Sequence, residues 1–111
     1  MNIEKIRAYI EANQARFLDE LTEYCRIPSI AAENRGLDEA AVWVERRLER
    51  LGATVRRITL PGAAPIIYAE IGPTDAAQTL LIYNHYDVQP ADPLDLWESP
   101  PFEPAIRNGK F

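Results

Sequence analysis

The sequence predicts an α/β fold. Two amphipathic helical stripes come first, two β-branched runs follow, and a short run without any polar residue comes next. An uninterrupted apolar run is typical of a strand that is covered on both faces, as strands are in sheets flanked by helices. The order of helices, then strands, then a buried run therefore indicates a sheet with helices packed against it.

The first helix is predicted from Ile3 to Cys25. Apolar residues recur there at spacings of three, four and seven, and Asn2 stands in front of them as an N-cap. Pro28 lacks a backbone N–H and disfavours helical angles in the residue before it, so the helix should end near Arg26. The segment from Ser29 to Gly36 is then a connection.

The second helix is the clearest one in the chain. Its apolar stripe begins at Leu37 and ends at Leu51, and charged residues occupy the opposite side. Gly52 follows directly and is a natural left-handed cap.

Strands are predicted after this glycine, because the composition changes to β-branched residues. The first is expected from Thr54 to Leu60 and the second from Ile66 to Ile71, with a turn over Pro61 to Pro65 between them. The apolar run from Leu80 to Tyr83 is the buried third strand.

The chain ends in a hairpin signal. Asn108-Gly109 is the dipeptide that a type I′ turn prefers, and residues 105–107 precede it as one arm. The returning arm, Lys110-Phe111, has only two residues. We therefore expect the chain to be cut within a hairpin at residues 106–111, and the natural protein to continue.

Composition limits the class of protein. The chain has 111 residues, 47% of them hydrophobic and 26% charged, which fits one folded domain or a piece of one. Its net charge of -5 argues against binding to nucleic acids or to anionic membranes. No apolar run approaches the roughly 20 residues of a membrane span. The single cysteine and the charged first ten residues favour the cytoplasm over secretion.

The negative charge lies in the second half of the chain. Residues 1–57 hold 10 acidic and 10 basic side chains, whereas residues 58–111 hold 7 acidic side chains and only Arg107 and Lys110 as basic ones. This asymmetry supports one alternative to an enzyme, a noncatalytic α/β interaction module with an acidic binding surface.

His85 is the only histidine, and it follows the predicted buried strand. Ligands of open α/β sheets bind beyond the carboxyl ends of strands. In an extended segment His85 and Asp87 point to the same side, so the carboxylate can hold one ring nitrogen while the other nitrogen binds a metal ion. An ordinary exposed histidine is the simpler alternative.

Other residues allow further chemistry. Asp92 and Asp95 can form a carboxylate pair with Asp87, although acids beside prolines are usually solvated loop residues. Cys25 can act as a nucleophile with His85, but a thiol at the end of an apolar stripe is more often buried and structural.

Four segments of the sequence carry a resemblance to a known family. They are residues 26–30, 81–90, 97–104 and 107–110. These segments resemble the family of di-zinc metallopeptidases that includes acetylornithine deacetylase, succinyl-diaminopimelate desuccinylase, aminoacylase and the carnosinase-type dipeptidases. The likeness is closest to the dipeptidase branch. Asn84 departs mildly from the family pattern, which often has glycine there.

The resemblance implies that residues 1–111 are the N-terminal portion of a zinc-exopeptidase-like catalytic domain, in which helices flank a mixed sheet. Two zinc ions, bridged by a carboxylate and a water molecule, would hydrolyse the amide bonds of dipeptides or N-acyl amino acids. His85 would be a ligand of one zinc ion, and Asp87 would be the catalytic-site residue that orients it.

The resemblance also limits what this chain can do alone. The other zinc ligands and the glutamate general base would lie beyond Phe111, so the fragment should bind zinc weakly or not at all and should be inactive. The implied partners are the small substrate, the rest of its own chain and a second copy in a homodimer, without nucleic acid or membrane.

Overall fold

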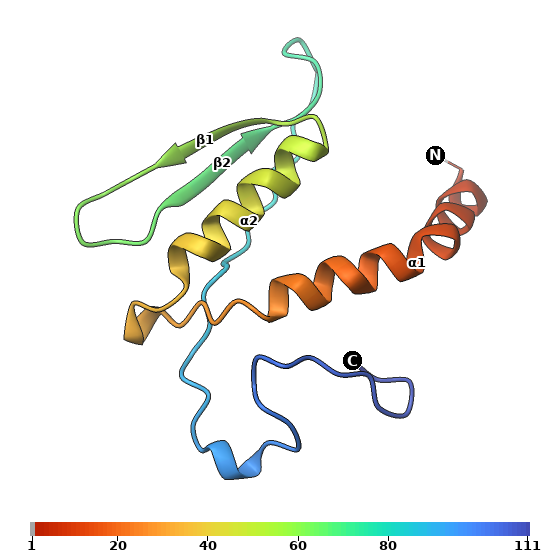
Figure 1. Cartoon of the computed structure of the whole chain (residues 1–111). Coiled ribbons are helices and arrows are strands. Elements are labelled where there is room, and N and C mark those ends of the chain that lie inside the picture. The colour runs from red at the N-terminus through yellow and green to blue at the C-terminus, as the bar shows by residue number, and fades with distance from the viewer. Residues whose placement is uncertain (1) are drawn as a thin grey trace. The chain divides into compact units, whose positions relative to one another are not determined.

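The computed structural model describes residues 2–111 (Figure 1). It contains two α-helices, α1 (Ile3–Cys25) and α2 (Leu37–Arg50), and two strands, β1 (Thr54–Ile58) and β2 (Ile66–Glu70). Short 3₁₀ turns cover Ala31–Glu33 and Leu94–Leu96. In the part of the chain that the structure describes, no helix is long and apolar enough to cross a membrane.

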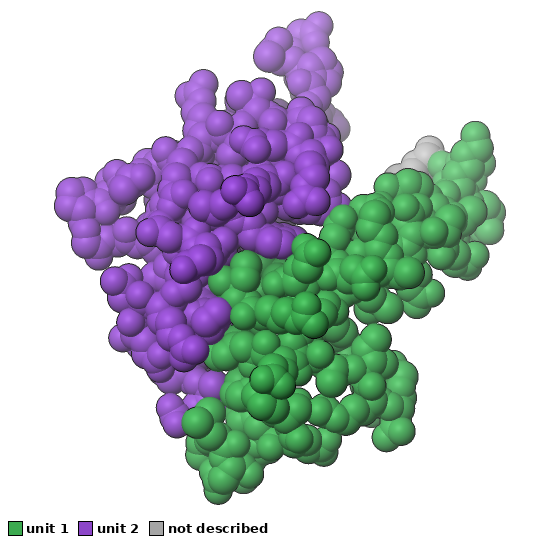
Figure 2. Space-filling model, viewed as in Figure 1, with its two compact units in different colours: residues 1–27, 93–111 green, residues 28–92 purple. Residues whose placement is uncertain are grey.

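The chain forms two compact units, which Figure 2 shows in different colours. Residues 28–92 make one unit, which contains α2, β1 and β2. Residues 1–27 and 93–111 make the other, which contains α1 and the C-terminal turn.

Helix α1 has the bounds that its sequence predicts. The side chain of Asn2 caps it by accepting a hydrogen bond of 3.3 Å from the N–H of Lys5, and Arg26 is its C-cap. No residue of α1 is buried. On its surface Arg16 forms an ion pair of 2.9 Å with Glu20 and lies 4.7 Å from the ring centroid of Phe17.

Helix α2 packs against both strands of an antiparallel pair (Figure 1). Thr54 pairs with Glu70 and Ile58 with Ile66, so each strand starts where predicted and ends one or two residues early. Arg57 of β1 forms ion pairs with two acids of α2, Asp38 and, at 3.5 Å, Glu45. The predicted left-handed glycine after the helix is confirmed, because Gly52 has φ +85°.

The core of this unit lies where α2 begins. Its buried apolar residues are Ile30, Leu37, Ala40 and Ala41, and Ser29 is buried beside them. Gly36, with φ +69°, closes the connection into α2. A Cβ atom at Gly36 would lie 2.6 Å from the carbonyl oxygen of Pro28, so the two backbone segments approach each other too closely for any other residue.

The predicted strand from Leu80 to Tyr83 is wrong for this chain. None of its four residues is in a strand, and their exposed fractions are 84, 84, 73 and 86%. A strand needs backbone partners on its edges and cover on its faces, and the described residues supply neither to this run. The α/β class is confirmed, but the sheet of residues 2–111 consists of the two antiparallel strands β1 and β2. A parallel bridge between Ile30 and Val88 lies outside this sheet.

The Asn-Gly turn is confirmed. Asn108 and Gly109 have φ +50° and φ +73°, the positive values that a type I′ turn requires at both central positions. Arg107 and Lys110 exchange two backbone hydrogen bonds of 2.9 Å across the turn.

Candidate metal-binding site

The candidate site is built around the imidazole of His85, on the segment that follows the exposed apolar run. Its Nδ1 atom lies 2.8 Å from the backbone carbonyl oxygen of Asp87 and 3.3 Å from the Oδ1 atom of the same residue. The side chain of His85 is 74% exposed. The predicted contact between the carboxylate and a ring nitrogen is therefore present, and the backbone carbonyl of Asp87 adds a closer one.

These contacts fix which nitrogen carries the proton. A carbonyl oxygen can only accept a hydrogen bond, so Nδ1 of His85 must be the donor. In the neutral imidazole the lone pair then lies on Nε2, the atom that is left for a metal ion. Oriented histidine ligands in metal sites show this arrangement, in which one nitrogen is held by a carbonyl or a carboxylate and the other binds the metal.

Tyr86, between the two site residues, attaches the segment to the sheet. Its hydroxyl donates a hydrogen bond of 2.5 Å to the carbonyl oxygen of Pro65, the residue before β2. Burial raises the pKa of Tyr86, although the nearby Arg57 opposes the effect. The phenol therefore remains protonated and able to donate at neutral pH.

Val88 attaches the other side of the segment to the core. Its backbone N–H donates a hydrogen bond of 2.8 Å to the carbonyl oxygen of Ser29, and its own carbonyl accepts one of 3.4 Å from Ala31. The sequence analysis predicted neither the attachment through Tyr86 nor the one through Val88. The available signal was that residues 26–30 and 81–90 both carry the family resemblance, which is consistent with their meeting in space.

No further metal ligands gather around His85 among the described residues. Within residues 2–111 the structure brings together no group of three or more histidine, cysteine or acidic side chains that could hold a metal ion. This absence concerns metal ligation, and the carboxylate pair predicted for Asp87 with Asp92 and Asp95 stays a prediction. Zinc needs three or four ligands. The residues present therefore fit only one part of a zinc site, a single imidazole ligand with its orienting carboxylate.

Cys25 has the properties of a structural thiol. It is a free cysteine at the end of α1 and is partly buried. Burial raises the pKa of its thiol, which lowers the fraction of reactive thiolate at neutral pH. A catalytic cysteine needs the opposite shift, so this environment counts against the cysteine hydrolase alternative.

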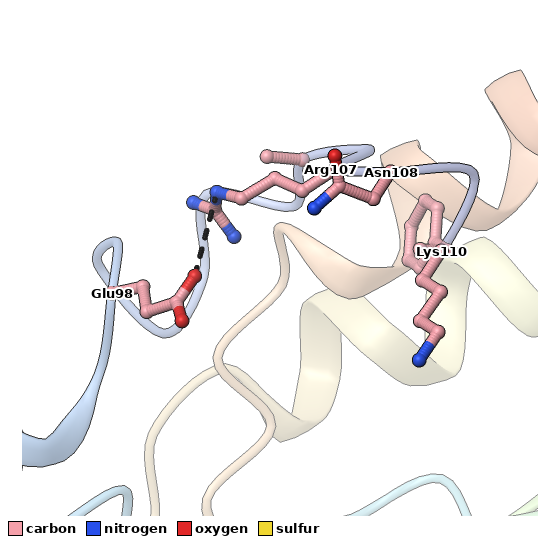
Figure 3. Close-up of a pocket in the computed structure, with 6 residues that line it drawn as sticks. Glu98, Arg107, Asn108 and Lys110 are labelled. Atoms are coloured by element: carbon pink, nitrogen blue, oxygen red, sulfur yellow. Dashed lines mark ion pairs between the residues drawn. The ribbon is translucent and has the colours of Figure 1, made fainter.

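A separate pocket of about 300 Å³ lies beside the C-terminal turn (Figure 3). Arg107 and Glu98 form an ion pair of 3.9 Å there, and the side chain of Lys110 points away from that pair. The pocket contains none of the residues that the sequence predicts for the site. Its lining is Glu98, Ala105, Arg107, Asn108, Lys110 and Phe111.

Comparison with known proteins identifies relatives along nearly the whole chain, although no family model matches it. The chain is 35% identical to the cysteinylglycine-S-conjugate dipeptidase of Corynebacterium striatum, over 89% of this chain and 22% of that protein. It is 31% identical to the β-Ala-His dipeptidase of Homo sapiens, over 98% of this chain and 24% of that protein.

A solved structure shows the same fold. It is a metallo-carboxypeptidase of the M20 family from Sulfolobus solfataricus, with a TM-score of 0.75 and 43% identity over 82% of this chain and 21% of that one. Fold and sequence together therefore show that the chain is similar to a segment of metallopeptidases. It is homologous to the M20 metallopeptidases, in their N-terminal part, and it spans about a quarter of the length of the curated relatives that it matches.

Proposed function

We propose that the complete protein is a zinc-dependent hydrolase that cleaves the amide bond of dipeptides or N-acyl amino acids. Residues 1–111 would be the N-terminal portion of its catalytic domain. The observation that carries the proposal is the orientation of the His85 imidazole. Asp87 holds its Nδ1 atom, and Nε2 is left for a metal ion. The homology to metallopeptidases supports the same assignment and disfavours the noncatalytic interaction module.

In this proposal His85 is a ligand of one of two zinc ions, and Asp87 orients the imidazole and increases its basicity. Bound zinc supplies acidification of a water molecule and polarisation of the scissile carbonyl. The contribution of this chain is to present an imidazole whose Nδ1 atom and ring orientation are held by Asp87. The other ligands and the general base belong to parts of the protein outside residues 1–111.

Dipeptides are the substrates that we propose first. Two relatives are named for dipeptides, a cysteinylglycine conjugate and β-Ala-His, and they align with 89 and 98% of this chain. A succinyl-diaminopimelate desuccinylase from Azoarcus is 43% identical over a shorter stretch, 60% of this chain, which supports N-acyl amino acids as the second choice. We further propose a cytoplasmic location, which the single free cysteine supports.

The test is an assay of the complete gene product with zinc, Cys-Gly and β-Ala-His. We expect turnover that a chelator removes and that added zinc restores. His85→Ala should abolish turnover, whereas Asp92→Asn, a change in a nearby acid outside the metal contacts, should retain it. Full activity of His85→Ala in a folded, zinc-loaded protein would disprove the proposal.

A companion experiment uses the 111-residue chain itself. With one imidazole and no cluster of further ligands in its described part, it should bind zinc only weakly and hydrolyse neither dipeptide. Tight one-to-one binding that His85→Ala abolishes would show that the chain holds a complete site of its own.

A further inference from the structure

We propose that the hydroxyl of Tyr86 is a positioning group for His85 and Asp87, and thereby sets the metal affinity of the site. This inference rests on the proposed function, because it assigns a role to a residue that does not itself contact the metal. Tyr86 lies between the two site residues in the chain, so in an extended segment its side chain points to the opposite side. His85 and Asp87 thus lie on one side of the segment, and the Tyr86 side chain, which attaches the segment to Pro65, lies on the other.

The attachment is a single strong contact with a rigid partner. The Tyr86 hydroxyl donates to the carbonyl oxygen of Pro65 at 2.5 Å, and Pro65 is buried immediately before β2. Because Pro65 is buried and directly precedes β2, its carbonyl is an acceptor held by the fold. Tyr86 itself is partly buried, whereas the His85 side chain is 74% exposed and has little packing to hold it.

Tyr86 acts on the imidazole through the backbone. The closest partner of His85 Nδ1 is the carbonyl oxygen of Asp87, a main-chain atom, at 2.8 Å. That carbonyl shares a peptide group with the Val88 N–H, which Ser29 holds, whereas the Tyr86 hydroxyl holds the backbone between this peptide group and His85. Removing the Tyr86 attachment therefore frees the backbone of His85 to move relative to the carbonyl that holds its proton, while Ser29 still holds that carbonyl.

The chain contains a matched control. Tyr68 of β2 also loses one hydrogen bond when its hydroxyl is removed, because it donates to the carboxylate of Glu70 at 2.6 Å. This contact is exposed and lies outside the site. Tyr68→Phe therefore measures the general cost of removing a phenol hydroxyl from this fold, and Tyr86→Phe measures that cost together with any effect on His85.

The experiment measures the zinc dissociation constant of the full-length protein by competition with a chromophoric chelator. Tyr86→Phe, Tyr68→Phe, His85→Ala and the double variant Tyr86→Phe/His85→Ala are compared with the native protein. Partners that orient a metal ligand are typically worth about 10- to 100-fold in affinity, and we expect a loss of about tenfold for Tyr86→Phe. Tyr68→Phe should change the constant less than about twofold.

The double variant separates positioning from general stability. If Tyr86 acts through the imidazole, its substitution has no further effect once His85 is alanine. An unchanged constant for Tyr86→Phe, or an equal loss with and without His85, would overturn the positioning role alone. A zinc constant that is unaffected by His85→Ala would instead overturn the proposed function, and the role of Tyr86 with it.

Discussion

The backbone N–H of Val88 donates a hydrogen bond of 2.8 Å to the carbonyl oxygen of Ser29. It joins the segment that carries His85 and Asp87 to the connection in front of α2, where Ser29 and Ile30 are buried. The exposed candidate site is thus attached to the most buried part of its unit. Substitutions in that buried connection should therefore alter the position of His85 and Asp87.

Gly36 is the position in this connection that should tolerate substitution least. We expect Gly36→Ala to lower the free energy of unfolding by about 2 kcal/mol or more, since it adds a backbone clash to the cost of a left-handed residue. The clash arises because the new Cβ would lie 2.6 Å from the Pro28 carbonyl oxygen. Urea unfolding measures the change.

Gly62 is the control for this substitution. It has nearly the same angle, φ +71°, but nothing lies within 4 Å of its added Cβ. Gly62→Ala should cost only the left-handed strain, about 1 kcal/mol. Equal losses for the two variants would show that the close approach of Pro28 is unimportant.

Asp87→Asn should weaken zinc binding in the full-length protein by about tenfold. The substitution removes the negative charge 3.3 Å from His85 Nδ1 but keeps the backbone carbonyl that lies closer. The proton therefore remains on Nδ1 and the ligand atom is unchanged, so the loss should be partial. Chelator competition measures it, and a loss as complete as that of His85→Ala would contradict the role of the carbonyl.

The apolar run from Leu80 to Tyr83 should respond to a charge in opposite ways in the two forms of the protein. In the 111-residue chain Leu81 is 84% exposed, so Leu81→Lys should increase solubility without changing stability. In the complete protein, where the sequence pattern predicts a covered strand, the same change should cost more than about 2 kcal/mol. Sedimentation and thermal unfolding would test the two expectations, and a neutral effect in the complete protein would reject the covered strand.

Cys25 should react slowly with thiol reagents. Burial raises its pKa, so the thiolate fraction at any pH below that value is smaller than that of a free cysteine. The raised value also favours the folded state at neutral pH. This contribution is lost as the pH rises from the ordinary thiol range, roughly 8.5, through the folded value. Alkylation rates of folded and urea-unfolded protein across this range would test it, and equal rates would contradict it.

Local signals predicted the helices and turns well. Asn2 and Pro28 bracket α1, Gly52 follows α2, and Asn108-Gly109 forms the expected turn, because each of these features depends on residues close in sequence. The contact between His85 and Asp87 was predictable for the same reason, since a period of two places both side chains on one side.

Long-range features were less predictable. The run from Leu80 to Tyr83 has the composition of a buried strand, but composition cannot tell which partners are present to cover it. The hydrogen bond from Tyr86 to Pro65 and the close approach of Pro28 to Gly36 also depend on tertiary packing. No periodicity in the sequence encodes such contacts, although the positioning role that we propose for Tyr86 relies on its contact with Pro65.

The division into two units has a consequence for synthesis on the ribosome. Residues 28–92 are one continuous stretch, so this unit can complete its contacts as soon as Asp92 has emerged. The other unit is discontinuous, and α1, although made first, must wait for residues 93–111. In nascent chains the segment that carries His85 should therefore make its contacts with the rest of residues 28–92 before α1 packs with residues 93–111.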